Sequence, residues 1–429
     1  MELEKLNDSN PWWPAGRVPD ELKGVARPEY GLLLRSVGIR EITIITGVRR
    51  SGKSTMMYQM IDSLLKGGLP PEQVLFINLE NPKLSGDGIE DAYRAYREGL
   101  NPDRKAYIFL DEIHRREGWE SWIRNMYDAG ENCKFVVSGS CSYLLKKEYS
   151  TLMTGRNISF AVFPLSFAEF LLFRGVDVKK DSLKKGIVTE KDKNTIVKHF
   201  SEYMESGGFP AVFFRPREFK TALLAQYFDD IIYKDIVDRH NLNAQKTRDF
   251  ALYLMANFGC PLSLRSVRSS LGLSYDAIKD YLSHFREAFL FFPVDHFSYS
   301  IKEQKTMPSK IYCIDNGLRN AVSFRFMKDE GRMAENLVFM ELKRRGNDVY
   351  YWKSEKQHEV DFVVKEIDQS LTAINVSYTN DIDERETRSL KTFKKEFAKT
   401  GKMILLTKNL EKKESGIFFI PLWKWALLR

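Results

Sequence analysis

The sequence has few cysteines and no long apolar run, and both absences exclude classes of protein. Its cysteines are scattered without C-x-x-C or Cys/His spacing, so the pattern indicates neither a disulfide framework nor a structural zinc site. No apolar run approaches the length of a membrane span, and the first residues, MELEKLNDSN, lack the basic-then-apolar pattern of a secretion signal. We therefore expect a soluble, cytoplasmic protein without a membrane partner. We expect reduced thiols at Cys133, Cys141, Cys260 and Cys313.

The chain has only a small excess of positive charge. Its 66 lysines and arginines exceed its 58 aspartates and glutamates by 8. This balance permits attraction to nucleic acid, but a solvated, mildly basic surface explains it equally well. At 429 residues and 43% hydrophobic, the chain is too long for one ordinary core, and its length predicts two or three domains.

The most informative motif lies between Thr43 and Thr55, which reads TIITGVRRSGKST. An apolar, strand-like run enters G-x-x-x-x-G-K-S and an amphipathic helical pattern follows, a context that a chance Gly-Lys-Ser sequence lacks. The glycines let the loop backbone turn its N–H groups toward an anion, and the helix N-terminus adds a favourable dipole. Lys53 is expected to reach the β- and γ-phosphates of ATP, and Ser54 to bind Mg²⁺. The expected nucleotide-binding residues are Gly47, Arg50, Ser51, Gly52, Lys53, Ser54 and Thr55.

A pair of carboxylates follows a buried strand further along the chain. Tyr107 to Glu112 reads YIFLDE, so the pair lies at the C-terminal end of the strand, the edge where ligands bind in open α/β sheets. We expect Asp111 to hold Mg²⁺ through its water shell and Glu112 to polarise the attacking water. A surface Asp-Glu pair is common by itself, but the upstream phosphate loop favours the catalytic interpretation.

Two further residues are candidates for the same reaction. Ser138 ends the next strand, in VVSGSCS, where its side chain is placed to contact the γ-phosphate or the water, although a simple strand-exit turn at Gly139 explains the pattern too. Arg156 precedes the fifth strand, and it is either a charge-stabilising finger for a neighbouring subunit's nucleotide or the partner of a local acid.

The order of apolar and amphipathic segments predicts the fold class. Between 41 and 166, short strands alternate with helices that begin near Lys53, Gly88 and Trp119, with a short helix around 143–147, which is typical of a parallel α/β sheet. The segment 176–198 is dense in Lys and Asp and is expected to be a charged loop or linker. The expected parts are an N-terminal arm packed over the sheet edge (1–28), an ATPase domain (29–175), the linker (176–198), a helical region (199–258), a winged-helix-like region (259–330) and a small α/β domain (331–429).

The region from 261 to 294 has the outline of a winged helix-turn-helix, with two helices, a Gly-Leu-Ser turn and an apolar hairpin-like segment. In a DNA-reading version, the helix 275–286 enters the major groove. Its polar residues are not notably basic, so a packing role stays open beside DNA binding.

The motifs together resemble a known family. GVRRSGKST, FLDEI, VSGS, TGR and FPLSFAEF occur in the order found in predicted AAA-superfamily ATP-binding proteins of bacteria and archaea, which carry a C-terminal domain of unknown function. YMESGGFP, YFDDIIYKDIVDRH, KIYCIDNGL, AENLVFMEL, VYYW and EVDFVV resemble that C-terminal domain. The resemblance extends from about Val25 to the C-terminus. It implies an AAA-type P-loop NTPase sheet, then a helical and winged-helix region, then a small nuclease-like α/β domain.

The terminal part of this family is similar to restriction-endonuclease-like folds, whose sites use a helix Glu, a strand-end Asp and an E-x-K pair to hold Mg²⁺ and orient water. Glu335 and Asp361 match the first two positions. Asn375 and Ser377 stand where the E-x-K acid and lysine are required, so we expect a degenerate site without nuclease activity. Glu359 is a possible substitute ligand, but no lysine follows it in the pattern.

The sequence therefore predicts an Mg²⁺-dependent ATPase of the AAA type, coupled to a winged-helix and nuclease-like module. DNA and further copies of the chain are candidate partners. Two alternatives stay open, namely a nucleotide-gated binding protein with little turnover and an ATP-driven DNA-processing nuclease.

Overall fold

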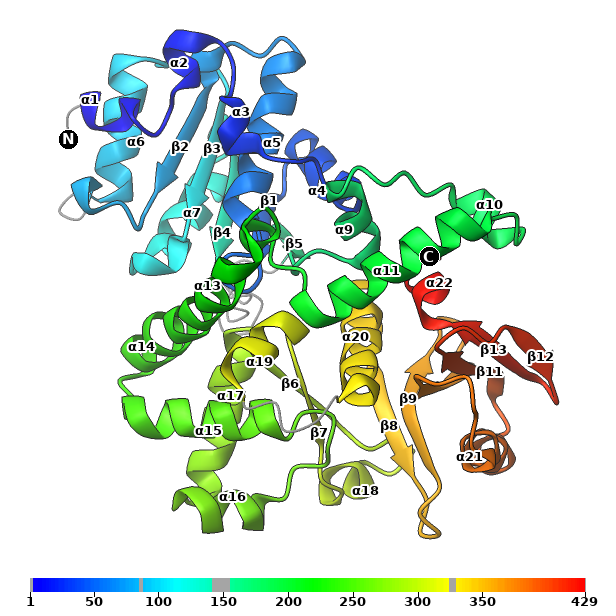
Figure 1. The fold of residues 1–429 in the computed structure, drawn as a ribbon. Helices are drawn as coiled ribbons and strands as arrows, with labels where there is room; N and C mark the ends of the chain where they lie inside the picture. The colour runs from blue at the N-terminus through cyan, green and yellow to red at the C-terminus, as the bar shows by residue number, and fades with distance from the viewer. Residues whose placement is uncertain (1–2, 85–87, 141–154, 324–328, 429) are drawn as a thin grey trace. The chain divides into compact units, whose positions relative to one another are not determined.

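The computed structural model describes residues 3–84, 88–140, 155–323 and 329–428. It divides into two compact units, Met1–Val162 and Phe163–Arg429, which we describe separately (Figure 1). The first unit ends before residue 175, where we expected the first domain to end. Cys141 and the short helix expected around 143–147 lie outside the described residues. Within the described parts of the chain, no helix combines the length and apolar character needed to cross a membrane.

The first unit is built on a parallel sheet with the strand order β2-β3-β4-β1-β5. Each strand coincides with an apolar run, so the predicted α/β fold is confirmed. Because β4 lies between β1 and β3, the loops after β1 and β3 are separated by one strand at the C-terminal edge. The elements are α1 (Glu4–Asn7), α2 (Trp12–Ala15), α3 (Asp20–Lys23), η1 (Pro28–Tyr30), α4 (Gly31–Arg35), η2 (Ser36–Gly38), β1 (Ile42–Thr46), α5 (Lys53–Lys66), η3 (Pro71–Gln73), β2 (Val74–Asn78), η4 (Pro82–Leu84), α6 (Ile89–Gly99), β3 (Ala106–Asp111), η5 (Ile113–Arg115), α7 (Trp119–Asp128), β4 (Cys133–Gly139) and β5 (Asn157–Ala161).

Apolar side chains from alternating strand positions build a core on each face of this sheet. Ile42 and Ile44 of β1 belong to a cluster with side chains of α6 and α7. Ile45 belongs to a second cluster with the methionines of α5. Since side chains along a strand point to opposite faces in turn, this division follows from the period of 2 in the sequence. The sheet is covered on both faces, as parallel sheets are, and ligand-binding loops extend from its C-terminal edge.

The N-terminal arm covers the edge strand β2. The side chain of Asn10 accepts a hydrogen bond from the N–H of Phe76 at 2.7 Å and donates one to its carbonyl at 2.9 Å. The indoles of Trp12 and Trp13 donate to the carbonyl of Val74 at 3.2 and 2.8 Å. These contacts confirm the expected packing over the sheet edge, and the arm contains the short helices α1 to α3 rather than only irregular chain.

The second unit begins with helices. The prediction of a loop across 176–198 is wrong in part, because α10 occupies some of this segment and α11 begins at Glu190. The hydroxyl of Thr189 caps α11 by accepting a hydrogen bond from the N–H of Asp192 at 3.1 Å, and burial of Ile196 anchors its first turns. The helices are α9 (Phe167–Phe173), α10 (Lys180–Lys184), α11 (Glu190–Ser206), α12 (Pro210–Phe213), α13 (Arg217–Asp230), the π-helical segment η7 (Ile231–Val237), α14 (Asp238–His240) and α15 (Ala244–Ala256).

A helix–turn–helix and a small antiparallel sheet follow. Gly272, with φ of 64°, ends the first helix in the left-handed conformation, and the hydroxyl of Ser274 caps the second by accepting from the N–H of Ala277 at 3.2 Å. The two strands of the sheet pair antiparallel but are separated in sequence by a further helix. The elements are α16 (Leu264–Leu271), α17 (Tyr275–Glu287), β6 (Phe291–Val294), α18 (Ile301–Thr306), β7 (Lys310–Cys313) and α19 (Asn316–Val322).

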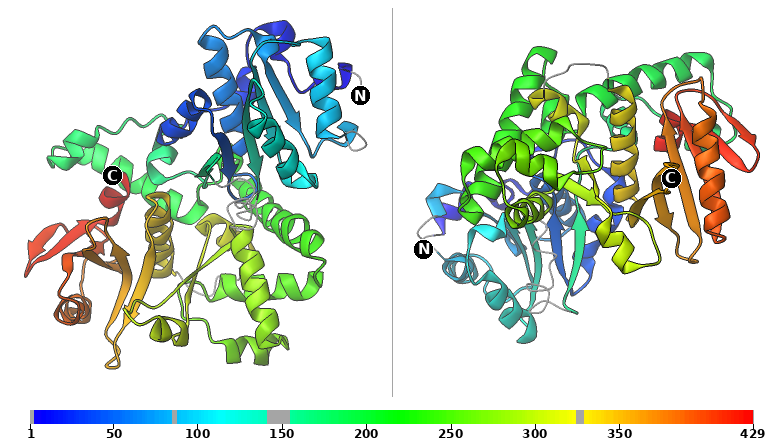
Figure 2. Two further views of the ribbon diagram at one scale, coloured as in Figure 1. Left: turned by 180° about the vertical axis from the view of Figure 1, so that it is seen from behind. Right: turned by 90° about the horizontal axis from the view of Figure 1, so that it is seen from below.

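The chain ends in a mixed sheet with the strand order β12-β13-β11-β10-β9-β8. Figure 2 shows this sheet between α20 on one face and the charged helix α21 on the other. Leu390 and Phe393 of α21 pack against Trp352 and Val363 of the sheet. The α/β pattern predicted for this region is confirmed. Its elements are α20 (Glu330–Arg344), β8 (Val349–Lys353), β9 (Glu359–Lys365), β10 (Leu371–Ser377), α21 (Glu384–Glu396), β11 (Thr400–Thr407), β12 (Lys412–Glu414), β13 (Ile417–Pro421) and α22 (Leu422–Leu427).

Candidate functional site

The loop between β1 and α5 has the backbone that an anion cradle needs. Gly47, Arg50 and Gly52 have φ of 146°, 68° and 101°. A Cβ at Gly47 would lie 2.1 Å from the carbonyl oxygen of Val162, so no larger residue fits there. Left-handed residues between right-handed ones orient successive N–H groups toward a common point, which is the geometry of backbone anion sites.

Lys53 lies buried against this loop. Its Nζ donates hydrogen bonds to the carbonyl oxygens of Gly47 at 3.1 Å and Val48 at 3.3 Å. The same ammonium lies 3.6 Å from Oε1 of Glu112, which extends from the end of β3. The lysine therefore connects the loop after β1 with the acidic pair after β3.

Asp111 is held by two hydroxyl groups. Ser54 Oγ donates to its Oδ2 at 2.6 Å, and Ser138 Oγ donates to its Oδ1. Complete burial and then the charge of Glu112 raise the pKa of Asp111 to about 6, although the two hydroxyls and Lys53 oppose the rise. The carboxylate is desolvated and fixed, beside the hydroxyl of Ser54.

Glu112 adopts an unusual backbone conformation, with φ of 55° and ψ of 47°. A left-handed non-glycine residue costs of order 1–3 kcal/mol, and such strain clusters at functional sites. Its Oε2 accepts a hydrogen bond from the N–H of Ser140 at 3.1 Å and lies 3.3 Å from Nδ1 of His114. Burial acts to raise the pKa of Glu112, but the charges of Lys53 and neighbouring cations hold it below its usual value. The side chain is thus kept ionised in a buried position.

The structure brings together Lys53, Ser54, Asp111, Glu112 and Ser138. Ser138 does more than end a strand, because its hydroxyl also accepts a hydrogen bond from the N–H of Glu112 at 3.2 Å. It therefore connects the carboxylate of Asp111 with the backbone of Glu112.

Three further predicted residues are Ser51, Thr55 and Arg156. Ser51 is buried, and its hydroxyl has no hydrogen-bond partner among the described residues. Thr55 faces the N-terminal arm, with its methyl group 3.5 Å from where a Cβ on Gly24 would be. Arg156 lies outside the cluster and forms a two-point ion pair with Asp128 at 2.7 and 3.1 Å, which supports the local-acid interpretation.

Sequence reasoning missed a second layer of charged residues. Glu80, just after β2, pairs with Arg49 of the loop at 2.9 Å and with Arg115 at 3.0 Å. Burial alone acts to raise the pKa of Glu80, but these two guanidinium groups lower it to about 2. Glu80 follows the apolar run QVLFINLE, so the strand-end rule that found Asp111 applies equally to it.

The N-terminal arm also supports the phosphate loop. Arg27 is buried, and its guanidinium donates to the carbonyl oxygen of Ser51 at 3.0 Å. Because the guanidinium binds a carbonyl oxygen, this contact does not use the N–H groups of the loop. No sequence signal marks it, since arginine in an irregular segment is common.

The degenerate nuclease-like site contains a lysine that the sequence pattern did not predict. Lys310 of β7 is 2% exposed, and its Nζ lies 3.0 Å from Glu335, 2.7 Å from Glu359 and 3.6 Å from Asp361. Tyr312 donates to Glu335 at 2.5 Å. The sequence pattern has no lysine after Glu359 and did not indicate Lys310. Lys310 precedes the motif in the chain and belongs to a different sheet, so only the tertiary fold brings it there.

Asp361 and Asn375 are hydrogen-bonded to each other and to their surroundings. Asn375 accepts from the N–H of Asp361 at 3.2 Å and donates to the carboxylate of Glu386 at 2.8 Å. Burial and then the charge of Glu335 raise the pKa of Asp361 to about 8, opposed by Lys310. Ser377 pairs with Thr407 in the sheet.

Family models match three parts of the chain. An AAA domain matches residues 39–171, and two domains of unknown function, DUF8612 and DUF4143, match residues 197–329 and 330–425. Uncharacterized protein MJ1544 of Methanocaldococcus jannaschii is 30% identical over 90% of this chain and 88% of its own length. An uncharacterized protein of Haemophilus influenzae is 30% identical over 90% of this chain and 94% of its own.

Solved structures are more distant. The Walker-type ATPase PABY2304 of Pyrococcus abyssi has a TM-score of 0.44 and 12% identity, covering 69% of this chain and 95% of that one. The phosphate loop, the strand order and the matched family models agree with one another. The chain belongs to the family of proteins in which an AAA domain with a parallel P-loop sheet is followed by the domains of unknown function DUF8612 and DUF4143.

Proposed function

We propose that the first unit binds and hydrolyses ATP with Mg²⁺, as an AAA-type ATPase coupled to the second unit. The observation that carries this proposal is the convergence of Lys53, Ser54, Asp111 and Glu112 at one edge of the sheet. A loop for phosphates, an oxygen pair for a metal and a buried carboxylate for water are the parts that phosphoryl transfer to water requires.

The donor set suits Mg²⁺. Ser54 Oγ, at the start of α5, and Asp111 Oδ2, at the end of β3, are hard oxygen donors 2.6 Å apart. When bound, the ion would neutralise charge that develops on the phosphates. Ser54 and Asp111 are the residues that would hold it.

The chain's own residues supply the rest of the mechanism. Lys53 exchanges its loop carbonyl partners for phosphate oxygens, which are stronger acceptors for an ammonium. Glu112, kept ionised by its cationic neighbours, accepts a proton from the attacking water. Ser138 fixes the relative position of Glu112 and Asp111 during this step.

Substitution of Lys53 tests the binding step. Lys53→Ala should weaken Mg-ATP binding at least tenfold, about 1.4 kcal/mol or more. The substitution removes the ammonium that this mechanism assigns to the phosphates. Equilibrium binding of a fluorescent ATP analogue measures this. Lys66→Ala, at the far end of the same helix and 72% exposed, is the matched control and should bind normally. Wild-type affinity in a folded Lys53→Ala variant would contradict the assignment.

The second unit is proposed to act as a binding module rather than a nuclease. The ammonium of Lys310 already occupies the place among these carboxylates where a metal would bind, and Asn375 replaces an acidic ligand. Plasmid and single-stranded DNA should therefore remain intact with the wild-type protein and Mg²⁺ or Mn²⁺. Cleavage that disappears in Asp361→Ala would instead favour the ATP-driven nuclease.

DNA is the proposed ligand of the helix–turn–helix region. The support is the arrangement of α16, a glycine turn, α17 and an antiparallel pair of strands, which is the outline of a winged helix. The test is steady-state ATP hydrolysis with and without double-stranded DNA. Turnover that rises with DNA supports coupling, whereas an unchanged rate together with no DNA binding contradicts it.

Arg156 is kept as a candidate finger in a homo-oligomer. For that role, its two-point ion pair with Asp128 must break. The competing interpretation is that Arg156 only pairs with this local acid. Mixing Arg156→Ala with Glu112→Gln subunits separates the two. Partial recovery of turnover supports a site shared between copies, and no recovery supports the local role.

A further inference from the structure

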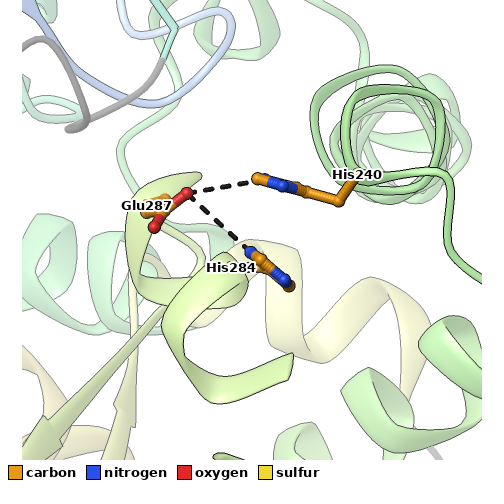
Figure 3. A group of neighbouring side chains, drawn as sticks. All are labelled: His240, His284 and Glu287. Atoms are coloured by element: carbon orange, nitrogen blue, oxygen red, sulfur yellow. Dashed lines mark ion pairs between the residues drawn. The ribbon is translucent and has the colours of Figure 1, made fainter. Parts of the chain in front are cut away.

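Two histidines and a glutamate face one another in the helical part of the second unit. His240 ends α14, which continues from the π-helical segment η7, and His284 and Glu287 lie one turn apart on α17. Figure 3 shows the three side chains converging from the two helices. π-Helical turns are rare and are often found at functional sites. This cluster lies outside the first unit, and the proposed ATPase mechanism does not use it.

The two histidine nitrogens that face Glu287 form no hydrogen bond with it. His240 Nε2 lies 3.4 Å and His284 Nδ1 lies 3.9 Å from its Oε2. Both nitrogens are buried, and neither has a hydrogen-bond partner among the described residues. A buried polar atom without a partner is costly.

The same distances suit a shared metal ion. Bonds of about 2.0–2.1 Å in a tetrahedral site place neighbouring ligand atoms about 3.3–3.4 Å apart. The pair formed by His240 and Glu287 is at this separation, and all three ligand atoms lie within 4.8 Å of one another. Rotation of the two imidazoles about their χ angles, which moves their stacked rings apart, completes the geometry.

The imidazole rings of His240 and His284 are stacked. Their ring centroids are 3.7 Å apart, with an interplanar angle of 26°. The two side chains therefore lie side by side, next to the carboxylate of Glu287.

Glu287 is oriented for this role. It is 8% exposed, and the hydroxyl of Ser283 donates to its Oε1 at 3.4 Å while Oε2 faces both histidines. A hydrogen bond to the second oxygen of a ligating carboxylate is a common support for metal sites.

We infer that His240, His284 and Glu287 bind one Zn²⁺-like divalent transition-metal ion. Two imidazoles and one carboxylate are the borderline ligand set that Zn²⁺ accepts, and the fourth position is left to water or a further ligand. The ion joins α14 to α17 and so stabilises the helical region around the π-helical turn.

The chain offers a matched control in His199 and Glu202 on α11. They have the same i, i+3 spacing, and Nδ1 of His199 lies 3.5 Å from Oε2 of Glu202. This pair lacks a second histidine, and Glu202 is already neutralised by Arg174 and Lys220. His199→Ala should therefore leave metal binding unchanged.

The test is titration of the chelator-treated full chain with Zn²⁺ alone, followed by calorimetry and by thermal unfolding. The wild type and His199→Ala should bind one ion per chain and unfold at a higher temperature with the ion. His284→Ala and Glu287→Gln should each bind at least about tenfold more weakly and lose the thermal shift. The visible absorption spectrum of bound Co²⁺ should differ between the wild type and these two variants.

Two results would overturn the inference. One is the absence of stoichiometric Zn²⁺ binding by the wild type. The other is equal loss in His199→Ala and Glu287→Gln, which would mean that surface histidines bind the ion. Glu287→Gln keeps the shape of the side chain, and ATP-analogue binding by the other unit checks that each variant is properly produced.

Discussion

At the scale of single residues, buried charges organise both sites of this protein. Lys53 connects the phosphate loop to Glu112, and Lys310 connects Glu335, Glu359 and Asp361. In each case one ammonium compensates carboxylates that burial alone would neutralise. The difference lies in what surrounds the lysine. Lys53 lies beside a backbone loop shaped for an anion, whereas Lys310 is enclosed by acidic groups.

Replacing Lys310 tests its structural role. Lys310→Met keeps the length of the side chain but leaves the carboxylates without their cation, and breaking a buried pair costs about 3–5 kcal/mol. We expect a clearly lower midpoint of thermal unfolding for the second unit. Lys413→Met, on the exposed strand β12, is the control and should change stability by less than about 0.5 kcal/mol. Equal midpoints for the two variants would show that the carboxylates do not depend on Lys310.

At the scale of elements, the edge of the first sheet is protected by the N-terminal arm. β2 is the edge strand of the sheet, and open strand edges invite aggregation unless their backbone groups find other partners. Asn10 acts there like one residue of an added strand, because its amide pairs with both backbone groups of Phe76. The buried indoles of the arm add hydrogen bonds to Val74.

Removing this amide should expose the edge. Asn10→Ala leaves a buried N–H and a buried carbonyl of Phe76 without partners, at a cost of about 1–3 kcal/mol for each group. Denaturant unfolding followed by tryptophan fluorescence should show a lower midpoint, with more aggregation on heating. Asn81→Ala removes an exposed turn contact to Lys83 and serves as the control. If both variants unfold at the wild-type midpoint, the arm does not stabilise the sheet.

The elements also show how far sequence reasoning reaches. The strands of the first sheet and the residues Lys53, Ser54, Asp111 and Glu112 were predictable, because apolar runs and glycine spacing are local signals. The helix beginning at Glu190 was missed, since its charged residues hide the apolar positions that anchor it. Lys310 was missed because no local pattern reports which strand of another sheet lies beside Glu335.

At the scale of the whole molecule, the chain combines two units with different chemistry. The first has the fold and the family match of an AAA domain. The second has a lysine-centred acidic cluster and a histidine cluster, on helices and strands matched by domains of unknown function. The activity proposed for the first unit is ATP hydrolysis.

The most direct test of that claim compares ATP turnover and ATP binding in the wild type and in Glu112→Gln. The substitution preserves the size of the side chain but removes the group that accepts the proton of the attacking water. We predict normal Mg-ATP affinity and turnover lower on the order of a hundredfold, so that the variant retains ATP. Equal turnover in both proteins, or no turnover in the wild type under any nucleotide condition, would contradict the account.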